Sequence, residues 1–168
     1  MAIKIQAVAI TVSDACSKGE RRDESGEVLV QALEALGAFV VDRSILSDDL
    51  EPLVGRLRRY AERPDVNLIV TTGGTGLGPR DNTPEATLMV IEREVPGIAE
   101  AIRAESLKIT PMAMISRGVA GIYQGTLIVN LPGSPKAVEE SFSVIRPILN
   151  HAIELLAGQT VHRELIDL

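Results

Sequence analysis

Aromatic residues are almost missing from this sequence. They make up 2% of its 168 residues, and there is no tryptophan. The core must therefore be built from Val, Ile, Leu and Ala, and the hydrophobic share of 45% allows this. Few aromatics also argue against a surface that stacks single-stranded nucleic acid. No block of Lys or Arg stands out and the formal net charge is -6, so we expect no nucleic-acid partner.

Cysteine and long apolar runs are also scarce. Cys16 has no second cysteine with which to form a disulfide, which fits a reducing compartment. No run approaches the ~18 apolar residues that cross a bilayer. Residues 1–12 interrupt an apolar alternation with Lys4 and Gln6, which is typical of a strand and not of a signal peptide. We therefore expect a cytoplasmic protein with no membrane partner.

Strand-like and helix-like segments alternate along the chain. Runs rich in β-branched residues predict strands at 5–12, 38–46, 67–72 and 126–131, with a hairpin turn at Gln124-Gly125. Helical periodicity marks 26–36, 50–62, 83–94, 98–107 and 135–156, with a kink or restart at Pro147, whereas 112–121 is ambiguous. The length fits a single domain over residues 1–168. The alternation predicts an α/β fold with a mostly parallel sheet, whose ligands bind beyond the carboxyl ends of the strands.

The strongest local signal is the segment TTGGTGLGPRDNTPEAT, Thr71–Thr87. A buried strand leads into Gly73, Gly74, Thr75 and Gly76, and we expect Thr83 to cap the following helix, with Pro84 at its first position. Glycines let main-chain N–H groups converge on an anion without an obstructing Cβ. The segment does not match a Walker A loop, because Pro79 and Arg80 follow Gly78. A phosphate-binding loop is favoured over a plain surface turn.

Charged residues adjoin this loop. Arg80 can pair with a phosphate, although it can also be a solvated loop residue. Asp81 suits a Mg²⁺ ion that bridges to triphosphate oxygens, or a turn. Asp48 and Asp49 follow the second strand and can either supply a second metal-facing carboxylate or cap a helix.

Further polar groups are expected at the same edge of the sheet. The loop at Pro132, Gly133 and Ser134 resembles the first glycine loop, because a strand, a glycine, a cap residue and a helix follow one another in the same order. This loop can bind a second polar ligand group or form a tight turn. Ser13 ends the first strand, while Asp23 and Ser25 open the first helix. The two histidines, His151 and His162, lack metal-ligand spacing and suggest no catalytic triad.

These motifs resemble the molybdopterin-binding MoaB/Mog family. Beyond Thr71–Thr87, the resemblance includes TVSDACSKG and DESG near the start, IEREVPGIAEAIR, the pair Ser116-Arg117, and LIVNLPGSPKA. It extends over nearly the whole chain, to about Leu156. The family includes Mog-type molybdopterin adenylyltransferases and the G domains of plant Cnx and of gephyrin.

The resemblance implies a three-layer α/β/α fold, a homotrimer, and adenylylation of molybdopterin by Mg²⁺-ATP with release of pyrophosphate. It implies that Asp48 and Asp81 are catalytic and hold the metal, with Asp49 as an alternative to Asp48. Nucleotide phosphates are expected at Gly73, Gly74, Thr75, Gly76, Arg80 and Thr83, and the pterin side at Ser13, Asp23, Ser25, Pro132, Gly133 and Ser134. A molybdate-insertion protein is an expected partner. The alternative function is that of a MoaB-type protein that binds molybdopterin or a precursor without adenylylating it, and a scaffold role is a third.

Overall fold

A computed structural model describes residues 3–159 of the protein. Its centre is one six-stranded sheet in the order β2-β1-β3-β6-β5-β4. Strands β1, β2, β3 and β6 are parallel, and β5 runs antiparallel to both β6 and β4. The mostly parallel sheet that the sequence predicts is therefore confirmed. The strands are β1 Gln6–Val12, β2 Phe39–Leu46, β3 Leu68–Thr72, β4 Arg93–Glu94, β5 Ala120–Tyr123 and β6 Thr126–Leu131.

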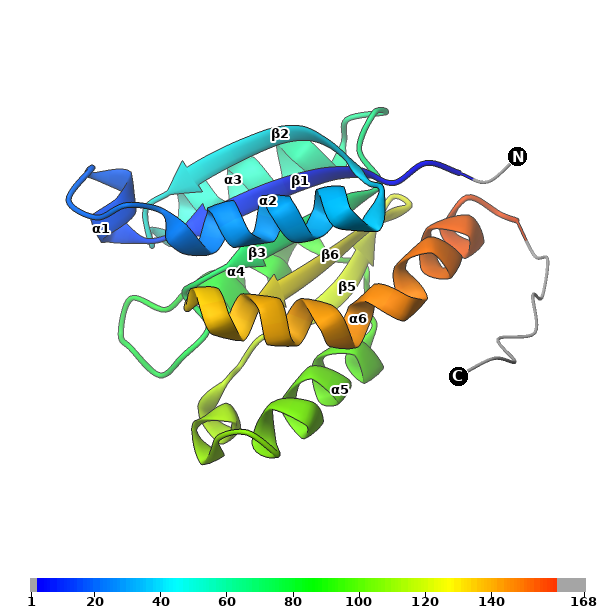
Figure 1. The fold of residues 1–168 in the computed structure, drawn as a ribbon. Helices are drawn as coiled ribbons and strands as arrows, with labels where there is room; N and C mark the ends of the chain where they lie inside the picture. The colour runs from blue at the N-terminus through cyan, green and yellow to red at the C-terminus, as the bar shows by residue number, and fades with distance from the viewer. Residues whose placement is uncertain (1–2, 160–168) are drawn as a thin grey trace.

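Helices cover both faces of the sheet, which gives the expected three layers. In Figure 1, α2, α5 and α6 lie in front of the sheet, and α3 and α4 lie behind it. The helices are α1 Asp14–Ser17, α2 Glu24–Leu36, α3 Leu50–Ala61, α4 Thr83–Val90, α5 Pro96–Leu107 and α6 Pro135–Leu156, with a short 3-10 helix η1 at Pro111–Ile115. No helix within residues 3–159 has the length and apolar character needed to cross a membrane.

Two apolar cores form because neighbouring side chains of a strand point to opposite faces of the sheet. On β1, Ala7 and Ala9 pack toward α2 and α6, whereas Val8 and Ile10 pack toward α3 and α4. All five residues of β3 are buried, as expected for a central parallel strand covered on both faces. This double burial holds the carboxyl ends of β1, β3 and β6 in fixed positions at one edge of the sheet.

Local signals account for several helix ends. The carboxylate of Asp23 accepts a hydrogen bond from the amide of Gly26 and caps α2, which ends at Gly37 with a φ of 90°. Ser134 caps α6 in the same manner. Helix α6 continues through Pro147 to Leu156, and its axis bends in its second half in Figure 1. The predicted kink is thus observed without a restart.

Several predicted boundaries were wrong. Helix α4 ends at Val90, before the predicted Glu94, because residues 93–94 join the sheet as β4. Thr83 is the first residue of α4 and does not cap it; its hydroxyl instead donates to the carbonyl of Gly73 at 2.9 Å. Helix α5 begins at Pro96 and not at the predicted residue 98. Proline is tolerated there because the N–H that it lacks would have no partner in the first turn of a helix. Helix α1 and η1 were not predicted, because neither is long enough to show a period.

Candidate active site

A cleft of about 860 Å³ lies at the carboxyl ends of the parallel strands. In Figure 1 this is the end at which β2 points toward α1. The cleft collects residues that are far apart in the sequence, because parallel strands place all their carboxyl ends along the same edge. Its lining includes the predicted site residues Ser13, Ser25, Asp48, Gly73, Gly74, Asp81, Gly133 and Ser134.

The two glycine-containing loops pack directly on each other beside this cleft. The amide of Gly73 donates to the carbonyl of Leu131, and the hydroxyl of Thr72 donates to the carbonyl of Pro132 at 2.7 Å. A Cβ on Gly133 would lie 3.2 Å from the Cα of Gly73. Gly73 itself has a φ of 97°, and a Cβ there would lie 2.3 Å from the carbonyl oxygen of Val12. Glycine at position 73 is therefore a packing requirement.

Asp48 is anchored at the cleft by three hydrogen bonds to two residues, Asp14 and Asn82. Its Oδ2 accepts the amide of Asp14 at 2.8 Å, and its own amide donates to Oδ1 of Asp14 at 3.1 Å. The side chain of Asn82 donates to the carbonyl of Asp48 at 2.8 Å. Burial raises the pKa of the Asp48 carboxyl, and the negative charges of Asp14 and Asp81 act in the same direction. No cation within residues 3–159 forms an ion pair with this carboxylate, which is typical of a cation site.

Asp81 is anchored by the turn that precedes it. Its Oδ2 accepts the amide of Gly78 at 2.8 Å. A Cβ at either Gly76 or Gly78 would lie 2.9 Å from that same oxygen, so both glycines make room for the carboxylate. No hydrogen bond within residues 3–159 reaches Oδ1 of Asp81 or Oδ1 of Asp48. Each aspartate therefore keeps one oxygen for a ligand.

Arg80 does not line the cleft but holds the acidic side chains beside it. It donates to both oxygens of Asp14, at 2.6 and 3.0 Å, and to Oδ1 of Asp49 at 3.0 Å. The hydrogen bond from Arg80 lowers the pKa of Asp14 to about 2. The structure thus brings Asp48 into the cleft and leaves Asp49 outside it, paired with Arg80. A contact between Arg80 and a phosphate stays a prediction.

Arg117 links both ends of the glycine loop. Its Nε donates to the carbonyl of Gly76 and its Nη2 to the carbonyl of Asp81, each at 2.7 Å, while the guanidinium also pairs with Glu85. Its amide donates to the carbonyl of Thr75 at 2.8 Å. These bonds hold three loop carbonyls on the side of Arg117, so this residue shapes the segment that carries Asp81. The sequence pointed to Arg117 only through the family resemblance.

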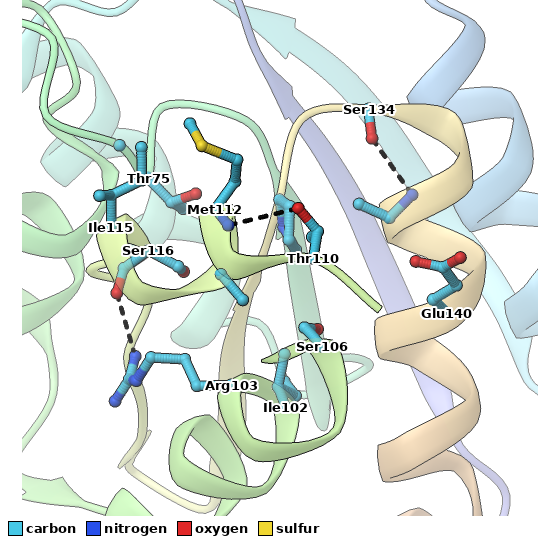
Figure 2. Close-up of a pocket in the computed structure, with 14 residues that line it drawn as sticks. Thr75, Ile102, Arg103, Ser106, Thr110, Met112, Ile115, Ser116, Ser134 and Glu140 are labelled. Atoms are coloured by element: carbon cyan, nitrogen blue, oxygen red, sulfur yellow. Dashed lines mark hydrogen bonds between the residues drawn. The ribbon is translucent and has the colours of Figure 1, made fainter. Parts of the chain in front are cut away.

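A second, smaller pocket of about 290 Å³ adjoins the cleft (Figure 2). Thr75, Gly76 and Pro132 line this pocket, so the glycine loop faces one cavity at Gly73-Gly74 and the other at Thr75-Gly76. Ser134 lines both cavities. The remaining wall comes from α5, η1 and α6 and includes Ile102, Arg103, Ser106, Thr110, Met112, Ala113, Ile115, Ser116, Ala137 and Glu140.

Two predicted site residues have internal partners. Asp23 is buried, accepts the hydroxyl of Thr11 at 2.8 Å and forms an ion pair with Arg43 at 2.7 Å. Thr83 is fully buried, and its hydroxyl is bonded to the loop carbonyl of Gly73. Neither lines the cleft or the smaller pocket, so direct contact of these two with substrate stays a prediction. Both support the loops that do line the cavities.

Comparison with known proteins identifies the family. Residues 8–151 match the family described as a probable molybdopterin binding domain. The chain belongs to this family. The MoaB/Mog resemblance that the sequence motifs predict is thereby confirmed, and the glycine loop, Asp48, Asp81 and both cavities lie inside the matched region of this molybdopterin-binding chain.

Individual relatives agree with this assignment. The molybdenum cofactor synthesis protein cinnamon of Drosophila melanogaster is 43% identical over 148 residues, which are 88% of this chain but 25% of cinnamon. The molybdopterin adenylyltransferase of Helicobacter pylori strain J99 is 36% identical over 89% of this chain and 86% of its own length. Among solved structures, the crystal structure of the molybdopterin biosynthesis enzyme MoaB from Thermus thermophilus superposes with a TM-score of 0.86. The two sequences are 44% identical, and the match covers 92% of this chain and 97% of the MoaB chain.

Proposed function

We propose that this chain transfers the adenylyl group of ATP to molybdopterin, giving adenylyl-molybdopterin and pyrophosphate. The observation that carries the proposal is the meeting of Asp48, Asp81 and Gly73-Gly74 in one cleft, beside a second pocket that shares Ser134. Two cavities joined at a phosphate-binding loop suit a reaction that brings together the phosphates of two substrates. The family membership and the adenylyltransferases among the relatives support the same reaction.

The larger cleft is the proposed ATP site. Its polar loops and its two carboxylates suit a triphosphate with a divalent cation. The smaller pocket, whose walls include Ile102, Ala113 and Ile115, suits the flat ring of a pterin. Under this division Ser13, Ser25 and Gly133, which the sequence predicts on the pterin side, line the nucleotide cleft. Thr75 and Gly76, which it predicts on the nucleotide side, line the pterin pocket.

The donor set fits Mg²⁺. This ion typically takes one or two carboxylates, with substrate phosphates and water supplying the other ligands. Asp48 and Asp81 are such a pair, and no cluster of three or more His, Cys, Asp or Glu side chains suited to a metal exists within residues 3–159. When bound, Mg²⁺ would neutralise charge on the triphosphate and on the departing pyrophosphate.

The protein's own part in the reaction is positioning. A phosphate oxygen of molybdopterin attacks the α-phosphorus of ATP, and the bond from that phosphorus to the oxygen bridging to the β-phosphate breaks. The amide of Gly73 is bonded to Leu131, but the remaining residues of the glycine loop and Ser134 line the two cavities, and their main-chain amides can stabilise the developing negative charge. Arg80 holds Asp14, and Asp14 in turn holds Asp48 through two bonds in which the main-chain amide of each aspartate donates to the carboxylate of the other. No cysteine or histidine is needed for this chemistry.

The proposal is tested with Asp81→Asn. Purified protein should convert molybdopterin and Mg²⁺-ATP to the adenylylated product, measured by chromatography of product and pyrophosphate. The variant should lose on the order of 100-fold or more in rate, because charge stabilisation of the transition state is lost. It should still bind molybdopterin, because Asp81 does not line the smaller pocket.

The matched control is Asp65→Asn, an aspartate that pairs with Arg63 away from both cavities. Turnover of Asp81→Asn equal to that of this control would clear Asp81 of the role. Binding of molybdopterin by wild-type protein without any product would leave the MoaB-type carrier as the function. The family resemblance supports two further parts of the proposal, a homotrimer and delivery of product to a molybdate-insertion protein, and the single cysteine supports a cytoplasmic location.

A further inference from the structure

One charged group stands out in the smaller pocket. Glu140 on α6 is the only acidic residue among the residues that line it. Figure 2 shows its carboxylate on the α6 side, with Ser106 and Thr110 on the facing wall from α5 and the segment that follows it. A carboxylate is costly to place against a partly apolar cavity unless a partner satisfies it.

Among the described residues, the Glu140 carboxylate has only one weak ion-pair partner. Within residues 3–159, no hydrogen bond reaches either of its oxygens, and the nearest cation is the Nζ of Lys136 at 3.7 Å. The Lys136 side chain is 79% exposed against 29% for Glu140, so water competes strongly for that pair. Arg103, the one cationic residue in the lining, donates instead to the carbonyls of Ser116 and Gly118. The acceptor capacity of Glu140 is therefore left for a ligand.

The position of Glu140 is well defined. Helix α6 is capped by Ser134 at the junction of the two cavities, and Glu140 follows less than two turns later. Its neighbours Val138, Ser141 and Phe142 are buried, which fixes the rotation of the helix about its axis. The carboxylate is thus presented from a rigid element at a set distance from the phosphate-binding loops.

The chemistry of the ligand follows from this geometry. A pterin carries a 2-amino-4-oxopyrimidine ring, whose N3–H and 2-amino group are adjacent donors that point in one direction. A carboxylate accepts such a pair with two parallel bonds, as it does from the fork of a guanidinium. Adenine offers no adjacent pair of this kind. The geometry points to Glu140 as the specificity-determining residue for the pterin ring, an inference that rests on the proposed function.

The test compares two rings that differ at one position. Binding of 6-hydroxymethylpterin and of 6-hydroxymethyllumazine, in which an oxo group replaces the 2-amino group, is measured by pteridine fluorescence without ATP. Wild-type protein should bind the pterin about 10- to 100-fold more tightly, because the lumazine turns an acceptor toward Glu140. Glu140→Gln should weaken pterin binding by a similar factor and leave lumazine binding nearly unchanged, so the preference disappears.

Glu139→Gln is the matched control. It removes the same charge from the neighbouring, exposed residue of α6 that does not line the pocket, so it should keep the wild-type preference. A Glu140→Gln protein that keeps the preference, or a wild-type protein that binds both rings alike or neither, would overturn the inference. In turnover, Glu140→Gln should raise the KM for molybdopterin and leave the KM for ATP unchanged. A Glu140-dependent preference without adenylyl transfer would refute only the proposed function.

Discussion

Arg117→Lys is the change that most directly tests how the glycine loop is held. Arg117 bonds the carbonyls of Gly76 and Asp81 at 2.7 Å each and also pairs with Glu85. A lysine keeps the charge, but its single ammonium group cannot reach all three partners. Two charge-assisted bonds are lost, and the loop carbonyls are only partly exposed. At about 1–1.5 kcal/mol each, the free energy of unfolding should fall by about 2–3 kcal/mol.

The assay is thermal unfolding followed by turnover at a temperature where both proteins are folded. For a chain of this length, the loss corresponds to a fall in Tm of roughly 5–10 °C. Turnover should fall at least about tenfold, because small displacements of a positioned group are costly in rate. The KM for molybdopterin should change less than kcat if Asp81 is the group displaced.

Arg63→Lys is the matched control. The Arg63 side chain is 34% exposed, as is that of Arg117, and it pairs with carboxylates on the surface, Asp42 and Asp65. Its replacement should cost at most about 1 kcal/mol and leave turnover unchanged. Equal losses of stability in the two variants would show that the loop carbonyls do not depend on Arg117. Full turnover in Arg117→Lys despite a lower Tm would refute its positioning role.

Two further changes test the carboxylate and the glycine in the cleft. Burial raises the pKa of Asp48, so the native state disfavours its ionised form and loses stability as pH rises above the ordinary value of 3.8. Asp48→Asn should abolish turnover because it removes a proposed metal ligand. Because it also removes the buried charge, it should raise Tm at pH 7, and this gain in Tm should vanish near pH 3. A lower Tm at pH 7 would contradict this reasoning. In Gly74→Ala, with a φ of 64°, the Cβ would lie 2.4 Å from the hydroxyl of Thr83, so urea unfolding should show a loss of about 2–4 kcal/mol. Gly19→Ala, with a φ of 72° and nothing within 4 Å, carries only the backbone strain, and an equal loss there would exclude the contact with Thr83 as a cause.

Much of the architecture could be predicted from local pattern. The four parallel strands show as runs rich in β-branched residues and the long helices show a period of 3.6, while helix caps are short-range signals such as Ser134 and Gly37. The short elements were missed because they contain too few residues to show a pattern. Strand β4 has two residues, and it exists because β5 offers a partner, which no local pattern records.

The sequence by itself determined the family, through several short motifs spread along the chain, and it predicted the glycine loop as a phosphate site and Asp48 and Asp81 as candidate carboxylates. Only the tertiary structure decided which of two adjacent charged residues lines the cleft, in the pair Asp48-Asp49 and in the pair Arg80-Asp81. Asp48 lines it and Asp49 does not, while Arg80 is turned to Asp14, 66 residues earlier. The tertiary structure also supplied the contacts of Arg117 and the place of Glu140 in the smaller pocket, because their partners and pocket are distant in the chain. Such choices depend on side-chain direction and on contacts across the sheet edge, and these are set only when separate strands pack side by side.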